Sequence, residues 1–256
     1  MRSNRTKQKL FAKQNVWGVF MQLPSPELVE VSALVGYDFV VVDCEHGAIS
    51  EDVAAHMIRA ADAAGITPLV RVPRNEAPTI MRYLDRGAQG IMVPQVNSVA
   101  DAKRAVEASR YFPAGRRGIA PNRPSDYGLA RELKDALADV NAETLVLVQL
   151  ENRNGVEYIA EIAQTEGVDV VFIGPGDLSQ SLGKPAQFDA PELHDTITRI
   201  IRACVQAQVP VGIYTGDSAD ARRYAEAGVL MQAVGDIGLF AAAARTFLQG
   251  ARARAR

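Results

Sequence analysis

The 256-residue sequence predicts an α/β protein of the (β/α)8, or TIM-barrel, class, and three observations carry that prediction. Eight short apolar segments recur along the chain, and each is followed by a stretch with helical periodicity. The segments are continuously apolar instead of alternating, which is typical of parallel strands buried on both faces. Eight such units in about 250 residues match the usual size of this barrel. We therefore expect residues 1–256 to form a single barrel domain.

The predicted strands follow one another at regular intervals. They cover residues 16–23, 38–46, 67–73, 90–96, 144–151, 168–175, 209–216 and 229–236. Gly closes several of the intervening helices, as in "DAAGI" and "AEAGV", where a left-handed backbone conformation is needed. Strict alternation of strand and helix implies parallel strands joined by right-handed crossovers. A doubly wound open sheet is the alternative fold, but no Gly-rich phosphate-binding motif follows the first strand.

One long irregular insertion interrupts this regularity. The segment "FPAGRRGIAPNRPSDYG" covers residues 112–128 and follows the helix after the fourth strand. A loop of this length in a compact domain usually has a function or takes part in assembly.

The composition argues against several classes of partner. The net charge of −2 and the pI of about 6.0 give no sign of a nucleic acid or an anionic membrane. The two cysteines, Cys44 and Cys204, fit a reducing compartment without a disulfide framework. No apolar run approaches the length of a membrane span, and the N-terminus lacks the apolar core of a signal peptide. We expect a cytoplasmic protein whose basic ends are solvated tails or a frayed helix end, not binding patches.

Ionisable and polar residues gather at the predicted C-terminal ends of the strands, where the active site of such a barrel lies. These residues are Asp43, Glu45 and His46 after strand two, Arg71 in strand three, Gln149 and Glu151 in strand five, and Asp177 just beyond strand six. All of them should point into one mouth, so the sequence predicts a shared site there.

Glu151 and Asp177 are a candidate pair of ligands for a hard divalent cation. Two carboxylates, with substrate oxygens and waters, can complete an octahedral site for Mg²⁺ or Mn²⁺. The alternative for Asp177 is that it caps the short helix after "GPG". The free N–H groups of the same turn could bind a carboxylate or phosphate. The alternative is that Gly-Pro-Gly is a common loop sequence without a binding role.

Arg71 and His46 carry groups suited to an ionic reaction. A guanidinium could neutralise negative charge that develops on a substrate oxygen. The alternative is an ion pair with Asp43 or Glu45 at the barrel rim, and the two roles are compatible. An imidazole suits proton transfer near neutral pH, whereas the structural alternative for His46 is a hydrogen-bonded loop residue.

Taken together, these motifs make the sequence similar to the HpcH/HpaI family of metal-dependent class II pyruvate aldolases, which includes 2,4-dihydroxyhept-2-ene-1,7-dioate and 2-keto-3-deoxy-glucarate aldolases. The resemblance covers nearly the whole chain through "GVF", "DCEH", "LVRVP", "YLDRGAQGIMVPQV", "RYFPAGRRG", "VQLE", "EGVDVVFIGPGDLSQSLG" and "AVGD". It implies a hexamer, a trimer of dimers with the last helix exchanged between neighbours. The apolar C-terminal stretch would equally suit a barrel that closes on itself.

The resemblance also implies roles for individual residues. His46 matches the general base, and Arg71 matches the residue that stabilises the enolate. Glu151 and Asp177 match the ligands of a divalent metal, Mg²⁺, Mn²⁺ or Co²⁺. The groups that match the binding site of the substrate's pyruvyl part are Gln149 and the backbone amides of Gly176 and Asp177.

Two further positions bear on the resemblance. Asp85, in "YLDRG", matches an acid that raises the basicity of the histidine. Its predicted place at the end of a helix puts it at the opposite rim of its own barrel, so it would act through a neighbouring subunit or indirectly. Phe20 stands where a relative has Trp, on the aldehyde side of the pocket, which leaves the identity of the aldehyde open.

The expected activity is the reversible, metal-dependent cleavage of a 4-hydroxy-2-oxo acid to an aldehyde and pyruvate, or a related 2-oxo acid such as hydroxypyruvate. A lysine Schiff base is another route to an enolate equivalent, but no lysine falls in a predicted strand. A malyl- or citramalyl-CoA lyase of the same superfamily is the alternative activity, with "RYFPAGRRG" as its only candidate for binding the CoA phosphates. A non-catalytic binding protein on the same scaffold is the third interpretation.

Overall fold

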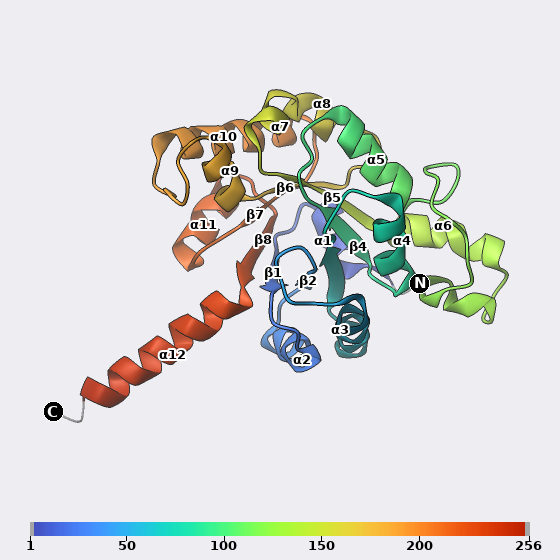
Figure 1. The fold of residues 1–256 in the computed structure, drawn as a ribbon, viewed down its shortest axis with the longest axis horizontal. Helices are drawn as coiled ribbons and strands as arrows, with labels where there is room; N and C mark the ends of the chain where they lie inside the picture. The colour runs from blue at the N-terminus through green and yellow to red at the C-terminus, as the bar shows by residue number, and fades with distance from the viewer. Residues whose placement is uncertain (1–2, 254–256) are drawn as a thin grey trace.

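The computed structural model describes residues 3–253, which contain a closed barrel of eight parallel strands (Figure 1). The strands pair in sequence order, and the last strand closes against the first. Their bounds are β1 Val16–Met21, β2 Phe39–Asp43, β3 Thr67–Arg71, β4 Gly90–Val93, β5 Leu145–Leu150, β6 Val170–Ile173, β7 Val211–Tyr214 and β8 Met231–Gly235. All eight predicted strands are present, and the (β/α)8 class is confirmed.

Helices precede the first strand and follow every strand. They are α1 Arg5–Phe11, α2 Pro26–Val35, α3 Glu51–Ala64, α4 Ala77–Asp85, α5 Val99–Ser109, a 3₁₀ helix Arg123–Gly128, α6 Leu133–Glu143, α7 Arg153–Glu157, α8 Ile159–Ala163, α9 Pro175–Ser181, α10 Pro191–Gln206, α11 Ser218–Glu226 and α12 Asp236–Ala253. Serines 25, 50 and 98 cap the starts of α2, α3 and α5. Gly36 and Gly65 end α2 and α3 in the left-handed conformation that glycine favours.

The strands carry two layers of apolar side chains, one on each face of the barrel wall. Phe20, Phe39, Leu69 and Phe172 belong to the cluster that fills the barrel. A larger cluster packs the outer faces of the strands against the helices. Burial on both faces explains why the strand sequences are continuously apolar.

The N-terminal segment is helical, which was one of the two expectations, but this helix is packed against the barrel and is neither frayed nor fully solvated. Helix α1 lies behind the ring of strands in Figure 1 and covers the end of the barrel where the strands begin. Its residues Thr6 and Leu10 lie four positions apart on one helix face, and both are buried. The Thr6 hydroxyl donates to Thr67 Oγ1 at 2.8 Å, and Asn4 Nδ2 donates to the carbonyl of Gln89 at 2.9 Å. The basic residues of this segment therefore gave no indication that one face of the helix is buried. At the C-terminus, residues 254–256 of the basic end lie outside the described part of the chain.

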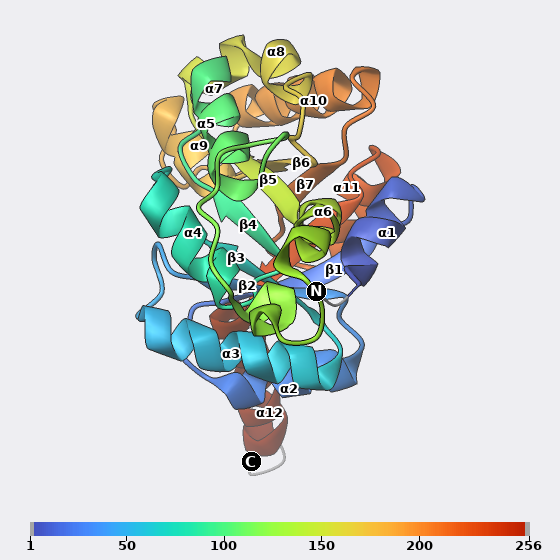
Figure 2. The ribbon, with the colours of Figure 1, turned by 90° about the vertical axis from the view of Figure 1, so that its right-hand side faces the viewer.

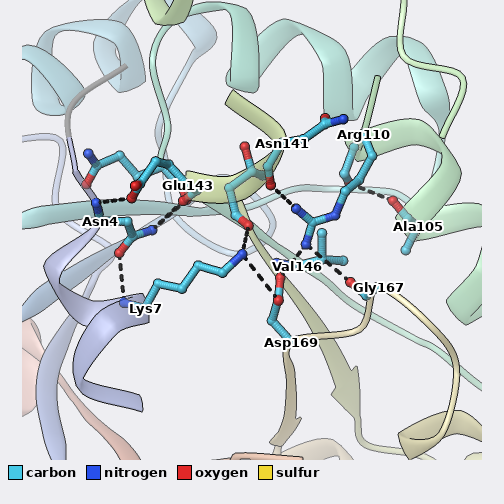
Figure 3. Close-up of polar contacts among 12 residues, drawn as sticks. Asn4, Lys7, Ala105, Arg110, Asn141, Glu143, Val146, Gly167 and Asp169 are labelled. Carbon is cyan, nitrogen blue, oxygen red and sulfur yellow. Dashed lines mark hydrogen bonds and ion pairs between the residues drawn. The ribbon is translucent and has the colours of Figure 1, made fainter. Parts of the chain in front are cut away.

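A buried polar cluster fastens this base of the barrel (Figure 3). The carboxylate of Asp169, just before β6, accepts hydrogen bonds from Arg110 Nη2 at 2.6 Å and from the Val146 N–H at 2.8 Å. Lys7 Nζ of α1 lies 3.4 Å from the other oxygen of Asp169. Burial lowers the pKa of Lys7, and the charge of Asp169 opposes that shift. The cluster lies at the end of the barrel away from the strand termini that carry the predicted site.

Helix α12 leaves the barrel after β8 and points away from it in both views (Figures 1 and 2). Phe240 and Phe247 on this helix are exposed. A cavity of about 540 Å³ lies beside β1 and β8, and Trp17, Tyr37 and Gln232 are among its lining residues. None of the helices within residues 3–253 has the length and apolar character that crossing a membrane requires.

Candidate active site

Three of the predicted polar residues, Arg71, Gln149 and Asp177, line a cavity of about 180 Å³ at the C-terminal ends of the strands. Its lining residues are Phe20, Gln22, Arg71, Gln149, Phe172, Gly174, Pro175, Gly176, Asp177 and Tyr214. All eight strands end earlier than predicted, and two of these ends affect the site: β2 ends at Asp43 and β5 at Leu150. Glu45, His46 and Glu151 therefore lie in the turns that follow, where the side chains no longer alternate across the barrel wall.

Arg71 and Asp43 form a buried, bidentate ion pair in the wall of this cavity. Arg71 Nε donates to Asp43 Oδ1 at 2.9 Å, and Nη2 donates to Oδ2 at 2.7 Å. Burial alone would raise the pKa of Asp43, but the hydrogen bonds and charge of Arg71 outweigh it and hold the pKa below its usual value. The guanidinium lies 5.1 Å from the ring centre of Phe20. The pair thus fixes a permanent positive charge beside the cavity.

His46 stands at the rim, with 56% of its side chain exposed, and is held through its backbone. Its N–H donates to Asp43 Oδ1 at 3.1 Å, so the turn is tied to the ion pair. His46 Nε2 lies 4.0 Å from Glu45 Oε2, and that oxygen lies 3.3 Å from Arg71 Nη1. Burial raises the pKa of Glu45, and the charge of Arg71 opposes the shift. The turn therefore brings imidazole, carboxylate and guanidinium together across the mouth.

Glu151 lies directly behind the cavity wall, with 2% of its surface exposed. Its Oε1 accepts a hydrogen bond from the Gln95 N–H at 2.8 Å, and its Oε2 accepts one from the Gln149 side-chain amide. Burial raises the pKa of Glu151 to about 7; the Gln95 bond opposes this shift, and the charges of Glu45 and Asp177 add to it. This carboxylate is costly to ionise unless a cation compensates it.

Replacing Glu151 by Gln should stabilise the metal-free protein at high pH. The raised folded-state pKa means that Glu151 favours the folded state fully below about pH 4.5, and that this contribution is lost as the pH rises through about 7. A shift from 4.5 to about 7 corresponds to roughly 3 kcal/mol. In EDTA, the melting temperature of the variant should exceed that of the wild type by several degrees at pH 8.5, and the difference should shrink toward pH 5. An equal melting temperature at pH 8.5 would contradict the assignment.

The turn between β6 and α9 approaches these side chains closely. A Cβ on Gly174 would lie 2.8 Å from both Gln149 Nε2 and Glu151 Oε2, so any larger residue would displace them. Gly176 has open space around its Cα, and Asp177 is exposed in the first turn of α9. Amides in a first helical turn have no intrahelical acceptor, so those of Gly176 and Asp177 can bind an anionic group.

The donor set around Glu151 fits a hard divalent cation. Within residues 3–253, no three or more His, Cys, Asp or Glu side chains form a complete cage, so a cation would need ligands beyond Glu151 and Asp177. Gln149 Oε1 and Glu45 Oε2 are buried and have no hydrogen-bond partner. Carboxylate and amide oxygens are the ligands that Mg²⁺ and Mn²⁺ accept, with substrate and water completing the shell.

Asp85 is not brought to this site within its own chain. It ends α4, whose C-terminal end lies at the base of the barrel because the helices run opposite to the strands. Its Oδ1 accepts hydrogen bonds from Arg117 Nη2 at 2.6 Å and Asn122 Nδ2 at 2.8 Å. Both partners come from the irregular insertion, so Asp85 fastens that segment to α4.

Three residues of the site were missed in the sequence. Tyr214 ends β7 and lines the cavity, and the rule that identified Arg71 would have found it. Gln22 follows β1, and its Nε2 lies 3.4 Å from Asp43 Oδ2. Gln95 supplies only its backbone N–H, from an unusual left-handed conformation with φ of 54°, and no side-chain pattern reveals such a donor.

Known proteins resemble this chain along most of its length. Residues 17–243 match the family model for HpcH/HpaI aldolase/citrate lyase. A 5-keto-4-deoxy-D-glucarate aldolase of Escherichia coli O157:H7 is 37% identical over 242 residues, which are 94% of this chain and 93% of the relative. A crystal structure of an HpcH/HpaI aldolase/citrate lyase family protein from Burkholderia cenocepacia J2315 superposes with a TM-score of 0.93 at 37% identity, covering 98% of this chain and 100% of the other. The citrate synthase SbnG superposes with a TM-score of 0.88 at 34% identity, covering 97% and 98%.

Proposed function

Because the chain belongs to the HpcH/HpaI aldolase/citrate lyase family, we propose that it reversibly cleaves 4-hydroxy-2-oxo acids to an aldehyde and pyruvate, or a related 2-oxo acid such as hydroxypyruvate. It is an aldehyde-lyase of this family. One observation carries the proposal: Arg71, paired with buried Asp43, lines the cavity, and the buried, hard-to-ionise Glu151 lies directly behind the lining residue Gln149, which donates to it. This arrangement holds a fixed positive charge and a cation-binding carboxylate at the place where an enolate would form.

Each residue of the site has a separate role in the proposed reaction. The amides of Gly176 and Asp177, with the side chain of Gln149, hold the carboxylate and 2-oxo end of the substrate. His46 accepts the proton of the 4-hydroxyl, and the C3–C4 bond then breaks to release the aldehyde. The bonding electrons pass to the pyruvate enolate, whose negative charge Arg71 stabilises. The enolate then takes up a proton at C3 to give pyruvate, and His46 gives up the proton that it had accepted. In the reverse direction, the enolate adds to the aldehyde carbon and His46 returns the proton to the new hydroxyl.

Glu151 and Asp177 would hold a divalent cation, Mg²⁺, Mn²⁺ or Co²⁺. When bound, such a cation would polarise the 2-oxo group and lower the energy of the enolate. The raised pKa of Glu151 and the buried Gln149 Oε1, which accepts no hydrogen bond, support this assignment.

We assign Asp85 an indirect role. Its carboxylate holds Arg117 and the insertion at the base of its own barrel, so it reaches a catalytic histidine only if a neighbouring subunit places its mouth against this surface. This role depends on the assembly proposed below.

Pyruvate release tests the proposed function. The protein is stripped of metal with EDTA and assayed on 4-hydroxy-2-oxo acids of different chain length, before and after Mg²⁺, Mn²⁺ or Co²⁺ is restored. Release should vanish on stripping and return with at least one cation. A folded protein that releases no pyruvate from any of these acids with any cation would contradict the proposal.

A malyl- or citramalyl-CoA lyase activity is disfavoured by the arginines of "RYFPAGRRG". Arg110 is buried in its pair with Asp169, and Arg117 is buried in its pair with Asp85. Of the three arginines in this segment, Arg116 alone is exposed, and one exposed arginine is a weak site for the CoA phosphates. Release of acetyl-CoA from malyl-CoA in the same assay, faster than pyruvate release from the oxo acids, would favour the lyase instead.

We propose that the chain forms a hexamer in which α12 packs onto a neighbouring subunit. The exposed Phe240 and Phe247 of α12 need an apolar partner, and the cavity beside Trp17 and Tyr37 is open to receive one. The mass measured by light scattering checks this: six times the chain mass of 27.6 kDa is expected, and a monomer would contradict it.

Two further assignments complete the proposal. We place the enzyme in the cytoplasm, in keeping with two unpaired cysteines, Cys44 and Cys204; cell fractionation tests this. Residues 1–256 act as one barrel domain, so a single unfolding transition is expected in calorimetry, and two separate transitions would contradict it.

A further inference from the structure

A second cavity, of about 290 Å³, adjoins the first one. The two cavities share three lining residues, Pro175, Gly176 and Tyr214. Pro175 and Gly176 open α9, and Tyr214 ends β7, so only one backbone turn and one aromatic ring separate the cavities. The helices around the second cavity are α9, α10 and α11, which Figure 1 shows next to β7.

The volumes of the cavities indicate that one of them alone does not hold the substrate. Small-molecule sites usually measure about 300–1,000 Å³. The first cavity, about 180 Å³, lies below this range, and the two cavities joined lie within it. The Tyr214 ring stands 5.8 Å from that of Phe20, which lies under Arg71. The boundary between the cavities is therefore on the side of the first cavity that carries Phe20 and Arg71.

The wall of the second cavity is amphipathic. Leu193 and Ile197 of α10 are buried and apolar, and Tyr224 of α11 is 9% exposed. The guanidinium of Arg223 lies 4.7 Å from the Tyr224 ring centre, and its Nη2 donates to Asp220 Oδ1 at 2.7 Å. An aromatic face beside paired charged groups suits a ligand that has both C–H and O–H surfaces.

The charges of this cavity disfavour an anionic ligand. Two carboxylates, Asp189 and Asp220, and one guanidinium, Arg223, line it together with His194. A free carboxylate would meet two like charges and an arginine that already has a partner. Hydroxyl groups can instead donate to the carboxylates and accept from the arginine and the histidine.

We propose that the second cavity receives the part of the substrate beyond C4, and that it selects uncharged, polyhydroxylated aldehydes over aldehydes with a terminal carboxylate. This inference rests on the proposed aldolase function and adds the class of aldehyde to it. The tail of the substrate passes Tyr214 and the Pro175–Gly176 turn, while the reacting carbons stay beside Arg71.

The test measures the reverse reaction with pyruvate and one of two aldehydes, D-erythrose or succinic semialdehyde. The variants are Asp220→Asn and Asp189→Asn, and Glu226→Gln is the matched control because Glu226 is an exposed acid of the same helix, α11. Each protein is also assayed for hydrogen–deuterium exchange at C3 of pyruvate without aldehyde, a step that needs only the first cavity.

The wild type should show a higher kcat/KM for D-erythrose than for succinic semialdehyde. Asp220→Asn should lower kcat/KM for D-erythrose about tenfold, the typical cost of losing a hydrogen bond to a charged group, and should raise the relative rate with succinic semialdehyde. Deuterium exchange should be unchanged in all variants, and Glu226→Gln should match the wild type in every assay.

Two results would overturn the inference on its own: a wild type that prefers succinic semialdehyde, or Asp220→Asn and Asp189→Asn variants that both keep the wild-type ratio of the two aldehydes while exchange is intact. Absence of deuterium exchange in the metal-loaded wild type is a different result. It would contradict the proposed function, and this inference would fall with it.

Discussion

Replacing His46 by Gln should lower kcat for pyruvate release by about 100- to 10,000-fold, which is the usual contribution of a positioned proton acceptor. The KM for the oxo acid should change little, because the groups assigned to binding the carboxylate, at Gly176 and Asp177, lie on a different loop. Steady-state kinetics of the metal-loaded protein measure both constants.

The matched control for this variant is His56→Gln. His56 is exposed on α3 and lines neither of the two cavities, so this change should leave kcat unaltered. A His46→Gln enzyme that keeps more than about a tenth of the wild-type kcat would show that another group accepts the proton.

Replacing Arg71 by Lys should lower kcat by about 100- to 1,000-fold, as expected when one preorganised charge contact to the transition state is lost. Lysine keeps the positive charge but cannot make the bidentate contact with Asp43, whose two bonds of 2.9 and 2.7 Å fix the guanidinium. The ammonium group would therefore not be held where the enolate charge develops. The loss should appear both in pyruvate release and in deuterium exchange at C3 of pyruvate, because both pass through the enolate.

Arg74→Lys is the control for this second variant. Arg74 follows β3, with 75% of its side chain exposed, and its Nη1 lies 3.8 Å from Glu76 Oε1. It should behave as wild type. If Arg71→Lys lowered the melting temperature but left kcat unchanged in protein that is still folded, the role of Arg71 would be structural.

The barrel could be predicted because its signal is repeated along the whole chain. Eight apolar runs with helices between them leave few topologies open. The strand ends could not be placed as well: the residues after Asp43 in "DCEH" extend a strand-like pattern, but the backbone there turns so that Asp43 accepts the N–H groups of Glu45 and His46. Composition cannot show such a local bond. The same limit hid α1, where four basic residues within 2–9 masked the buried Thr6 and Leu10.

The candidate site was predictable where a charged side chain interrupts an apolar strand. Arg71 is the example, and its pairing with Asp43 was already one of the two expected roles. Residues that matter because they leave room for a neighbouring side chain, or because they supply a backbone N–H, were not predictable. Gly174 is required because a Cβ at this position would lie too close to the side chains of Gln149 and Glu151. Gln95 contributes a backbone N–H, and the direction of this N–H depends on one left-handed φ angle. His194 of α10 lines the second cavity, and nothing in the helical pattern around it indicates this position.

The central claim is that the mouth of this barrel forms a pyruvate enolate with the help of a divalent cation. The most direct test is the proton NMR signal of the pyruvate methyl group in D₂O, recorded with protein that has been stripped of metal and then reloaded. The signal should persist with stripped protein and decay once Mg²⁺, Mn²⁺ or Co²⁺ is added, and the decay should be absent from the Arg71→Lys variant. A methyl signal that remains constant with folded, metal-loaded wild type would contradict the account.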